Sequence, residues 1–233
     1  GVGGDAAIEA LLEGLSRSPL MSGLIVCSMR HLPPVETERA VRLALRWHGR
    51  GVIGFDLAGA ELGHPPGVHA RALAIARDAG LPITLHAGEA DAAERVLEAV
   101  RLGARRIGHG VRLAEALADP ARTHLVEELI ASGVHLEVCM TSNVHTGAAA
   151  SLAAHPIAAL WRAGVSLSFH TDNRLISCIT HSGEALRLVR YADLSPTECQ
   201  RMVVQAVRHS FLPEHQRVRA LAAVQGWDAK RDA

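Results

Sequence analysis

Short apolar runs recur along the chain at intervals of about 30 residues, and each is bounded by glycine, proline or polar residues. The runs are brief and several are rich in β-branched residues, which is typical of strands that are buried on both faces. The pattern therefore predicts six strands, over residues 24–29, 51–56, 82–86, 106–109, 135–139 and 165–170.

Between these runs, apolar residues return at the three- and four-residue spacing of a helix that buries one face. Several such segments end at a glycine, for example Gly80 and Gly133, as expected for a helix C-terminus in the left-handed conformation. The segment Ser195-Pro-Thr-Glu198 has the sequence of a capping box that opens a helix. The predicted helices cover residues 6–16, 36–47, 68–79, 90–102, 120–132, 155–163 and 195–208.

A strand followed by a helix, six times over, predicts parallel strands joined by crossover helices. An open doubly wound sheet and a (β/α)8 barrel both have this order. A complete barrel has eight such units and about 250 residues, whereas this chain has 233 residues and a helix before its first strand. We expect residues 1–233 to form a single α/β domain, a (β/α)8 barrel truncated at the N-terminus, with about six of its eight units.

Composition and charge narrow the class of protein. Hydrophobic residues make up 48% of the chain but aromatic residues only 3%, so we expect a core of aliphatic side chains. The 24 basic residues balance the 24 acidic ones, which disfavours nucleic acid or an anionic membrane as a partner. We expect neither a membrane span nor a signal peptide. Four widely spaced cysteines predict reduced thiols in a cytoplasmic protein: Cys27, Cys139, Cys178 and Cys199.

Polar residues follow or end five of the six predicted strands. The carboxyl ends of the strands in an α/β barrel meet at one mouth, where the catalytic groups of such enzymes lie. We therefore expect these side chains to converge there: Asp56, His86 with Glu89, His109, Asn143, and Asp172 with Asn173. Most of the other titratable residues in loops and on helix faces are assigned to solvent: Glu61, His64, His69, His124, His181 and His215.

The strand-end residues have both a chemical and a structural interpretation. His86 can offer a neutral nitrogen to a divalent metal, Asp172 can offer a carboxylate oxygen, and Glu89 can reach a metal-bound water. Alternatively, His86 and His109 pack as ordinary core residues, Glu89 stabilises a helix N-terminus, and Asp172 caps a helix. The convergence of three strand ends favours the chemical interpretation. Two further histidines, His145 and His170, also lie near the mouth, but their spacing assigns them no role.

Several motifs carry a resemblance to a known family. They are Phe55-Asp-Leu-Ala-Gly59-Ala-Glu61, His86-Ala-Gly-Glu89, Arg106-Ile-Gly-His109-Gly110, Thr141-Ser-Asn143, Thr146-Gly147, His155-Pro156, Thr171-Asp172-Asn173 and Ser210-Phe-Leu212. In this order, the chain resembles the adenosine deaminase family of zinc hydrolases from about residue 20 to about residue 225. The resemblance implies that a zinc-bound hydroxide attacks C6 of adenosine or 2'-deoxyadenosine, giving inosine and ammonia.

The resemblance also implies residue roles. His86 and Asp172 would be ligands of a single Zn2+, and Glu89 would shuttle a proton to the purine ring. His109 would orient the hydroxide, and the backbone of Gly59 would contact the purine. The implied partner is a small purine nucleoside.

Two departures from the family pattern matter. The family carries a His-X-His pair that supplies two further zinc ligands, and this chain contains none, so those ligands are expected from a segment N-terminal to it. Asn173 stands where many members have an aspartate facing N7 of the purine. An asparagine amide donates a hydrogen bond to that nitrogen as it stands.

Two other functions stay open. The chain could be a catalytically inactive remnant of this fold that acts as a binding module, since two zinc ligands are missing. It could also be a deaminase of adenine or of another aminopurine. The oligomeric state is not predictable from the sequence.

Overall fold

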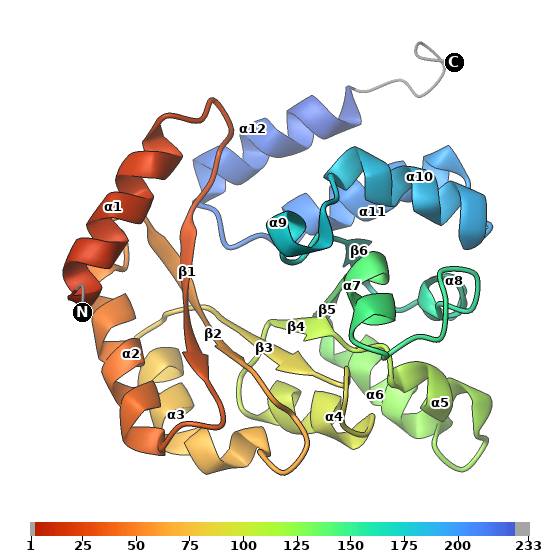
Figure 1. The fold of residues 1–233 in the computed structure, drawn as a ribbon, viewed down its shortest axis with the longest axis horizontal. Helices are drawn as coiled ribbons and strands as arrows, with labels where there is room; N and C mark the ends of the chain where they lie inside the picture. Colours follow the sequence, from red (N-terminus) through yellow and green to blue (C-terminus); the bar gives the residue numbers. More distant parts are fainter. Residues whose placement is uncertain (1–2, 227–233) are drawn as a thin grey trace.

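The computed structural model describes residues 3–226 and contains one sheet of six parallel strands (Figure 1). The order of the strands in the sheet is their order in the sequence. Their bounds are β1 Leu24–Met29, β2 Val52–Ala58, β3 Ile83–Ala87, β4 Arg106–His109, β5 His135–Val138 and β6 Leu167–Phe169. All six predicted strands are therefore confirmed, with β2 two residues longer than expected at its C-terminal end.

Helices surround the curved sheet (Figure 1). α2 packs against β1 and β2, and α11 packs against β6. The helices are α1 Gly4–Ser16, α2 Pro34–Trp47, α3 Ala70–Asp78, α4 Glu94–Arg101, α5 Leu113–Ala118, α6 Thr123–Ser132, α7 Met140–His145, α8 Ile157–Arg162, α9 Arg174–Ser177, α10 His181–Tyr191, α11 Pro196–Arg208 and α12 Glu214–Gln225, with a 3-10 turn, η1, at Pro66–His69.

The topology distinguishes between the two expected architectures. In a doubly wound sheet the strand order reverses at a switch point, whereas here every strand pairs with its neighbours in sequence. The protein therefore has the parallel order of a (β/α)8 barrel. Within residues 3–226, β1 and β6 are not paired with each other, so the barrel is open between them.

The core is aliphatic, as the composition predicted. All four residues of β4 are buried, and Leu85, Ile107 and Leu136 on three adjacent strands are fully buried. Such side chains favour strands because their branched bodies pack well on a pleated surface covered by helices. This packing holds the carboxyl ends of β2 to β5 in a fixed arrangement.

Local signals account for most helix ends. The capping box is formed: Ser195 and Glu198 each bond to the other's backbone N–H at the start of α11. Gly133 adopts the left-handed conformation at the C-terminus of α6. The predicted helix over 68–79 instead begins as the turn η1 before α3, because Pro65 and Pro66 restrict the backbone there. The short helix α7, directly after β5, was not predicted.

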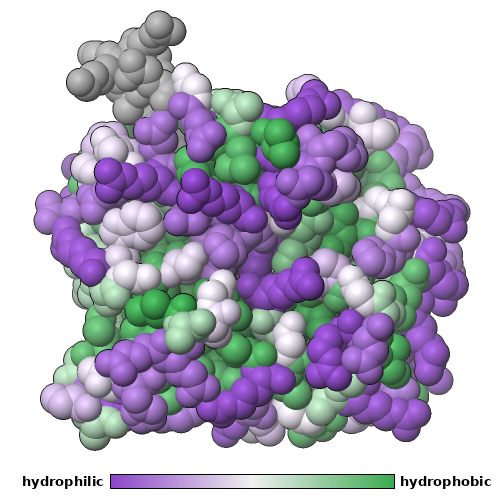
Figure 2. Space-filling model, turned by 180° about the vertical axis from the view of Figure 1, so that it is seen from behind, coloured by the Kyte–Doolittle hydropathy of each residue, from purple (hydrophilic) through white to green (hydrophobic). Residues whose placement is uncertain are grey.

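The outer surface mixes residue types. Seen from behind, hydrophobic residues are interspersed with hydrophilic ones (Figure 2). Across residues 3–226, we find no helix with the length and apolarity needed to cross a bilayer.

Candidate active site

His86 lies near the C-terminal end of β3, and its Nδ1 is 3.1 Å from Oδ1 of Asp56 on the adjacent strand β2. Burial opposes a charge on this imidazole, but nearby carboxylates, Asp56 foremost, outweigh it and raise the pKa of His86 to about 9. The ring packs closely on Gly108 of β4, where an added Cβ would approach its Cγ to 3.2 Å. The environment of His86 therefore favours positive charge, and because Nδ1 faces Asp56, Nε2 is the nitrogen that a metal could bind once it has lost its proton.

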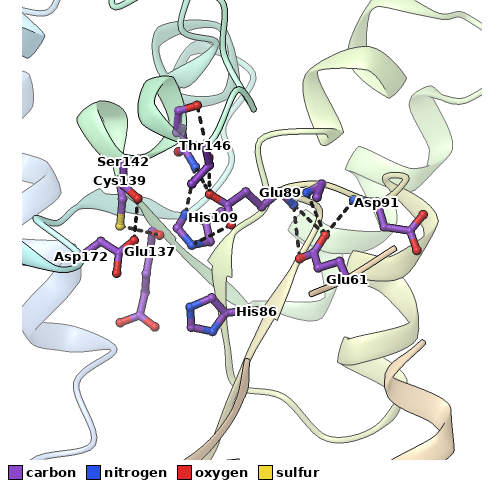
Figure 3. Close-up of polar contacts among 12 residues, drawn as sticks. Glu61, His86, Glu89, Asp91, His109, Glu137, Cys139, Ser142, Thr146 and Asp172 are labelled. Atoms are coloured by element: carbon purple, nitrogen blue, oxygen red, sulfur yellow. Dashed lines mark hydrogen bonds and ion pairs between the residues drawn. The ribbon is translucent and has the colours of Figure 1, made fainter. Parts of the chain in front are cut away.

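Glu89 follows β3 in the turn that leads to α4, and its side chain is held from the opposite side of the mouth (Figure 3). Its Oε1 accepts hydrogen bonds from Oγ1 of Thr146 at 2.8 Å and from Nδ2 of Asn143 at 3.1 Å. Its Oε2 lies 3.5 Å from Nε2 of His109. A carboxylate and an imidazole placed in this way can exchange a proton with a bound molecule.

His109 is the last residue of β4 and is 3% exposed. Burial lowers its pKa, so the neutral form is favoured. Its φ of 70° is unusual for a residue with a side chain and costs about 1–3 kcal/mol, as is often found at functional sites. The strained backbone brings the ring to within 5.2 Å of the His86 ring, measured between centroids.

Asp172 follows β6 and has a second left-handed backbone, with a φ of 53°. Its Oδ2 accepts a hydrogen bond from Oγ of Ser142 on α7 at 2.6 Å. Figure 3 shows it facing the space beside His86 and His109, and its charge contributes to the raised pKa of His86. Unlike those two imidazoles, Asp172 is exposed.

Gly59 follows β2, and Asn173 lies beyond β6 at the start of α9. Gly59 has a φ of 96°, and a Cβ there would approach Met29 and His31 closely. Asn173 caps α9, with its Oδ1 accepting from the backbone N–H of Ile176 at 3.3 Å. This bond occupies the carbonyl oxygen and leaves the amide N–H groups of Asn173 free to donate. Their roles toward a purine stay predictions.

The described residues do not complete a zinc site. Zinc sites of enzymes use three or more protein ligands, but nowhere in residues 3–226 are three His, Cys, Asp or Glu side chains grouped to hold a metal. His86 and Asp172 offer a nitrogen and an oxygen donor, so the chain supplies two ligands of suitable chemistry.

Two residues assigned to solvent are instead buried. Glu61 is 4% exposed, and its Oε2 accepts from the backbone N–H groups of Glu89, Ala90 and Asp91 at 3.1, 2.9 and 2.8 Å. His69 is 1% exposed and bonds to Oγ1 of Thr37 at 2.9 Å. Both assignments failed because folding brings partners from distant segments to polar side chains that look exposed in the sequence.

Glu61 therefore holds the turn that carries Glu89, which sequence reasoning missed. The signal was present, since Glu61 ends one of the motifs that carry the family resemblance. Thr146 and Ser142, which bond to Glu89 and Asp172, also belong to or adjoin such motifs.

The two histidines without a predicted role have different surroundings. His145 ends α7 and is exposed. His170 bonds through Nε2 to Oγ of Ser168 at 2.6 Å, and Ser168 bonds to Nε2 of His135 at 2.7 Å. Burial lowers the pKa of His170 to about 4 and that of His135 to about 2. These imidazoles are neutral members of the polar network within the sheet.

Comparison with known proteins gives concordant results. An adenosine deaminase from Enterococcus faecalis (strain ATCC 700802 / V583) is 37% identical over 207 residues, covering 89% of this chain and 60% of that protein. The chain thus spans less than two thirds of the length of this relative. The crystal structure of an adenine deaminase from Arthrobacter aurescens matches with a TM-score of 0.85 at 27% identity, covering 96% of this chain and 68% of that one.

A zinc-bound amidohydrolase from Burkholderia ambifaria also has a TM-score of 0.85, covering 96% of this chain and 62% of that one, at 18% identity. At this identity the similarity concerns the fold alone, and it supports the barrel architecture. The family model for adenosine deaminase matches residues 4–227, which is nearly the whole chain. The chain therefore belongs to the adenosine deaminase family.

Proposed function

We propose that this chain is the greater part of a zinc-dependent hydrolase. The enzyme deaminates adenosine to inosine and 2'-deoxyadenosine to 2'-deoxyinosine. The observation that carries the proposal is the placement of Glu89 and His109, 3.5 Å apart and beside His86 at the ends of two adjacent strands. Membership of the adenosine deaminase family supports the same chemistry. The chain forms one barrel domain in this proposal.

The reaction defines what the residues must do. The oxygen of water forms a bond to C6 of the purine, the bond from C6 to the amino nitrogen breaks, and ammonia leaves. A proton must reach the ring nitrogen beside C6, and another must reach the departing amino group. Glu89 transfers these protons through its carboxyl group, while His109 holds the attacking oxygen and stabilises the charge that develops there.

The mouth supplies the purine contacts. Asn173 donates an amide N–H to N7, which its capping bond to Ile176 leaves free to do. Gly59 presents its backbone to the purine, since it has no side chain of its own. The balanced overall charge suits a neutral nucleoside rather than a nucleic acid. Four unpaired cysteines support a cytoplasmic location.

A zinc ion held in the completed site would supply an activated water, because zinc lowers the pKa of a bound water to about 7. His86 and Asp172 are the two ligands that this chain offers. The two further histidine ligands come from a polypeptide segment that fills the opening between β1 and β6. The coding sequence upstream of Gly1 tests this directly, since an in-frame strand ending in His-X-His is expected, and a stop codon or an unrelated domain would contradict it.

Ammonia release from adenosine, 2'-deoxyadenosine and adenine, by the protein that includes this segment, tests the activity. We expect release from the two nucleosides. Release from adenine alone would favour the second candidate function, an adenine deaminase. The similarity to the structure of an adenine deaminase is the observation that favours this candidate. No release from any aminopurine by the zinc-loaded protein would leave a binding module instead of an enzyme.

A further inference from the structure

Asn143 lies between the two candidate catalytic side chains and is fully buried on α7. Its Nδ2 is 3.1 Å from Oε1 of Glu89 and 3.0 Å from Nδ1 of His109. Its Oδ1 is 3.2 Å from Nε2 of His155. An amide donates only through nitrogen and accepts only through oxygen, so the orientation of this one group decides which way every bond in the network runs.

At the His155 end of this network, a backbone amide fixes the direction of the hydrogen bonds. The N–H of Ile157 donates to Nδ1 of His155 at 3.2 Å, so this nitrogen carries no proton. Burial lowers the pKa of His155 to about 4, and the ring is therefore neutral at physiological pH. A neutral imidazole with an accepting Nδ1 has its proton on Nε2, and that N–H donates to Oδ1 of Asn143.

At the Glu89 end of the network, a carboxylate group fixes the direction of the hydrogen bonds. Oε1 of Glu89 accepts a hydrogen bond from Oγ1 of Thr146 at 2.8 Å, so this oxygen is an acceptor and the group of Asn143 beside it must be the NH2. Both ends thus demand the same amide orientation. The second N–H of Asn143 then points at Nδ1 of His109, which has to accept it.

We propose that Asn143 is a positioning residue that holds His109 in the tautomer protonated on Nε2. In this tautomer the ring proton lies on the nitrogen that faces Oε2 of Glu89. The same side chain holds Glu89, so one amide sets the geometry of the proton-transferring pair. This inference deepens the proposed function and rests on it for its catalytic meaning, but its structural content requires neither metal nor substrate.

The tautomer is measured on the nitrogen-15-labelled chain by long-range correlation of ring protons with ring nitrogens. We expect Nε2 of His109 to carry the proton in the unmodified protein. Asn143→Asp keeps the shape of the side chain and replaces both N–H donors by an acceptor. Nδ1 of His109 then faces an acceptor, so we expect Nδ1 to carry a proton in this variant, whether or not Nε2 keeps its own proton beside Oε2 of Glu89.

The matched control is Asn173→Asp, which changes the only other asparagine of the chain. Asn173 bonds to the backbone of α9 and not to His109, so this variant should leave the tautomer unchanged. A proton on Nδ1 in the unmodified chain overturns the proposal, whatever the variant does. A folded Asn143→Asp protein in which Nδ1 of His109 carries no proton also overturns it.

The outcome is separable from that of the proposed function. If His109 shows the expected tautomers but the zinc-loaded protein releases no ammonia from adenosine, the inference stands and the proposed function fails. If ammonia is released but the tautomer does not respond to Asn143→Asp, the reverse holds.

Discussion

The strand ends in the middle of the sheet differ from those at its two edges. At β3 and β4, His86 and Glu89 are hydrogen bonded to residues from other strands and helices, and His109 is buried between them. At the edges, β1 exposes Met29 and the segment after β6 exposes Asp172. The middle strands have partners on both sides, whereas β1 and β6 each have one.

This difference separates two tasks of the proposed site. The groups proposed to transfer protons, Glu89 and His109, are hydrogen bonded to other residues of this chain, so their geometry is set on folding. Of the two proposed metal ligands, His86 lies on the middle strand β3 and Asp172 follows the edge strand β6, and the described residues offer only these two donors. The chain is therefore expected to preorganise proton transfer and to depend on an added segment for metal binding.

The largest expected effect concerns the middle of the sheet. In the zinc-loaded protein, Glu89→Gln should lower the rate of ammonia release from adenosine by about 10²–10⁴-fold, because an amide cannot transfer the proton. Zinc content, measured by metal analysis, should not change. The control is Glu127→Gln, which alters an exposed carboxylate on α6. Unchanged turnover in Glu89→Gln would rule out the assigned role.

A second test concerns the turn that carries Glu89. Glu61→Gln replaces a carboxylate oxygen that accepts three backbone N–H groups, and should lower the free energy of unfolding by about 1.5–3 kcal/mol. The amide hydrogens of residues 89–91 should exchange faster with solvent. Urea unfolding and hydrogen exchange measure both, with the exposed Glu9→Gln on α1 as control. Unaltered exchange at these amides would show that Glu61 does not hold the turn.

Acid should lower the free energy of unfolding through His155, the imidazole that bonds to Asn143. Burial lowers the pKa of His155 to about 4, whereas an unfolded histidine has a pKa of about 6.5. As the pH falls through this window, the unfolded chain binds a proton that the native chain does not. The free energy of unfolding therefore falls by about 1 kcal/mol per pH unit from this residue, and above the window it contributes no pH dependence.

His155→Gln should remove this contribution and make the pH dependence shallower. Urea unfolding at several pH values between about 4 and 6.5 measures the slope. His215→Gln, an exposed change on α12, should leave the slope as it was. If the slope stays the same in His155→Gln, burial does not keep this imidazole neutral in the native state.

The smallest effect is expected at the open edge. Leu175 on α9 is 83% exposed, so Leu175→Ala should change the free energy of unfolding by less than about 0.5 kcal/mol. In the middle of the sheet, even the smaller change Ile107→Val should cost about 0.5–1.5 kcal/mol. A large loss in Leu175→Ala would mean that this edge is packed in solution and that the comparison fails.

The sequence predicted the elements well because their signals are local. Each strand is a short apolar run bounded by turn residues, and the helix α11 begins at a capping box that the chain forms within four residues. Helix α7 escaped prediction because Met140–His145 is short and follows β5 without a turn signal. Its position matters, since it carries Ser142 and Asn143 to the mouth.

The site was predicted as a set of strand ends but not as a network. The order of the strands fixes that His86, Glu89 and His109 lie near each other, because parallel strands present their carboxyl ends at one mouth. The sequence could not show that Glu61 is buried, since its partners are backbone N–H groups of a turn 28 to 30 residues away. Burial and partners of this kind depend on how the loops fold back.

By itself, therefore, the sequence determined the strand and helix order, the barrel class, the family motifs and the absence of a His-X-His pair. Only the tertiary structure decided that one buried amide, Asn143, bonds to both Glu89 and His109, and that β1 and β6 do not pair with each other within residues 3–226. The physical reason is that apolar periodicity and turn chemistry act within a few residues. Hydrogen-bond polarity and edge pairing instead depend on groups that meet only after the chain has folded.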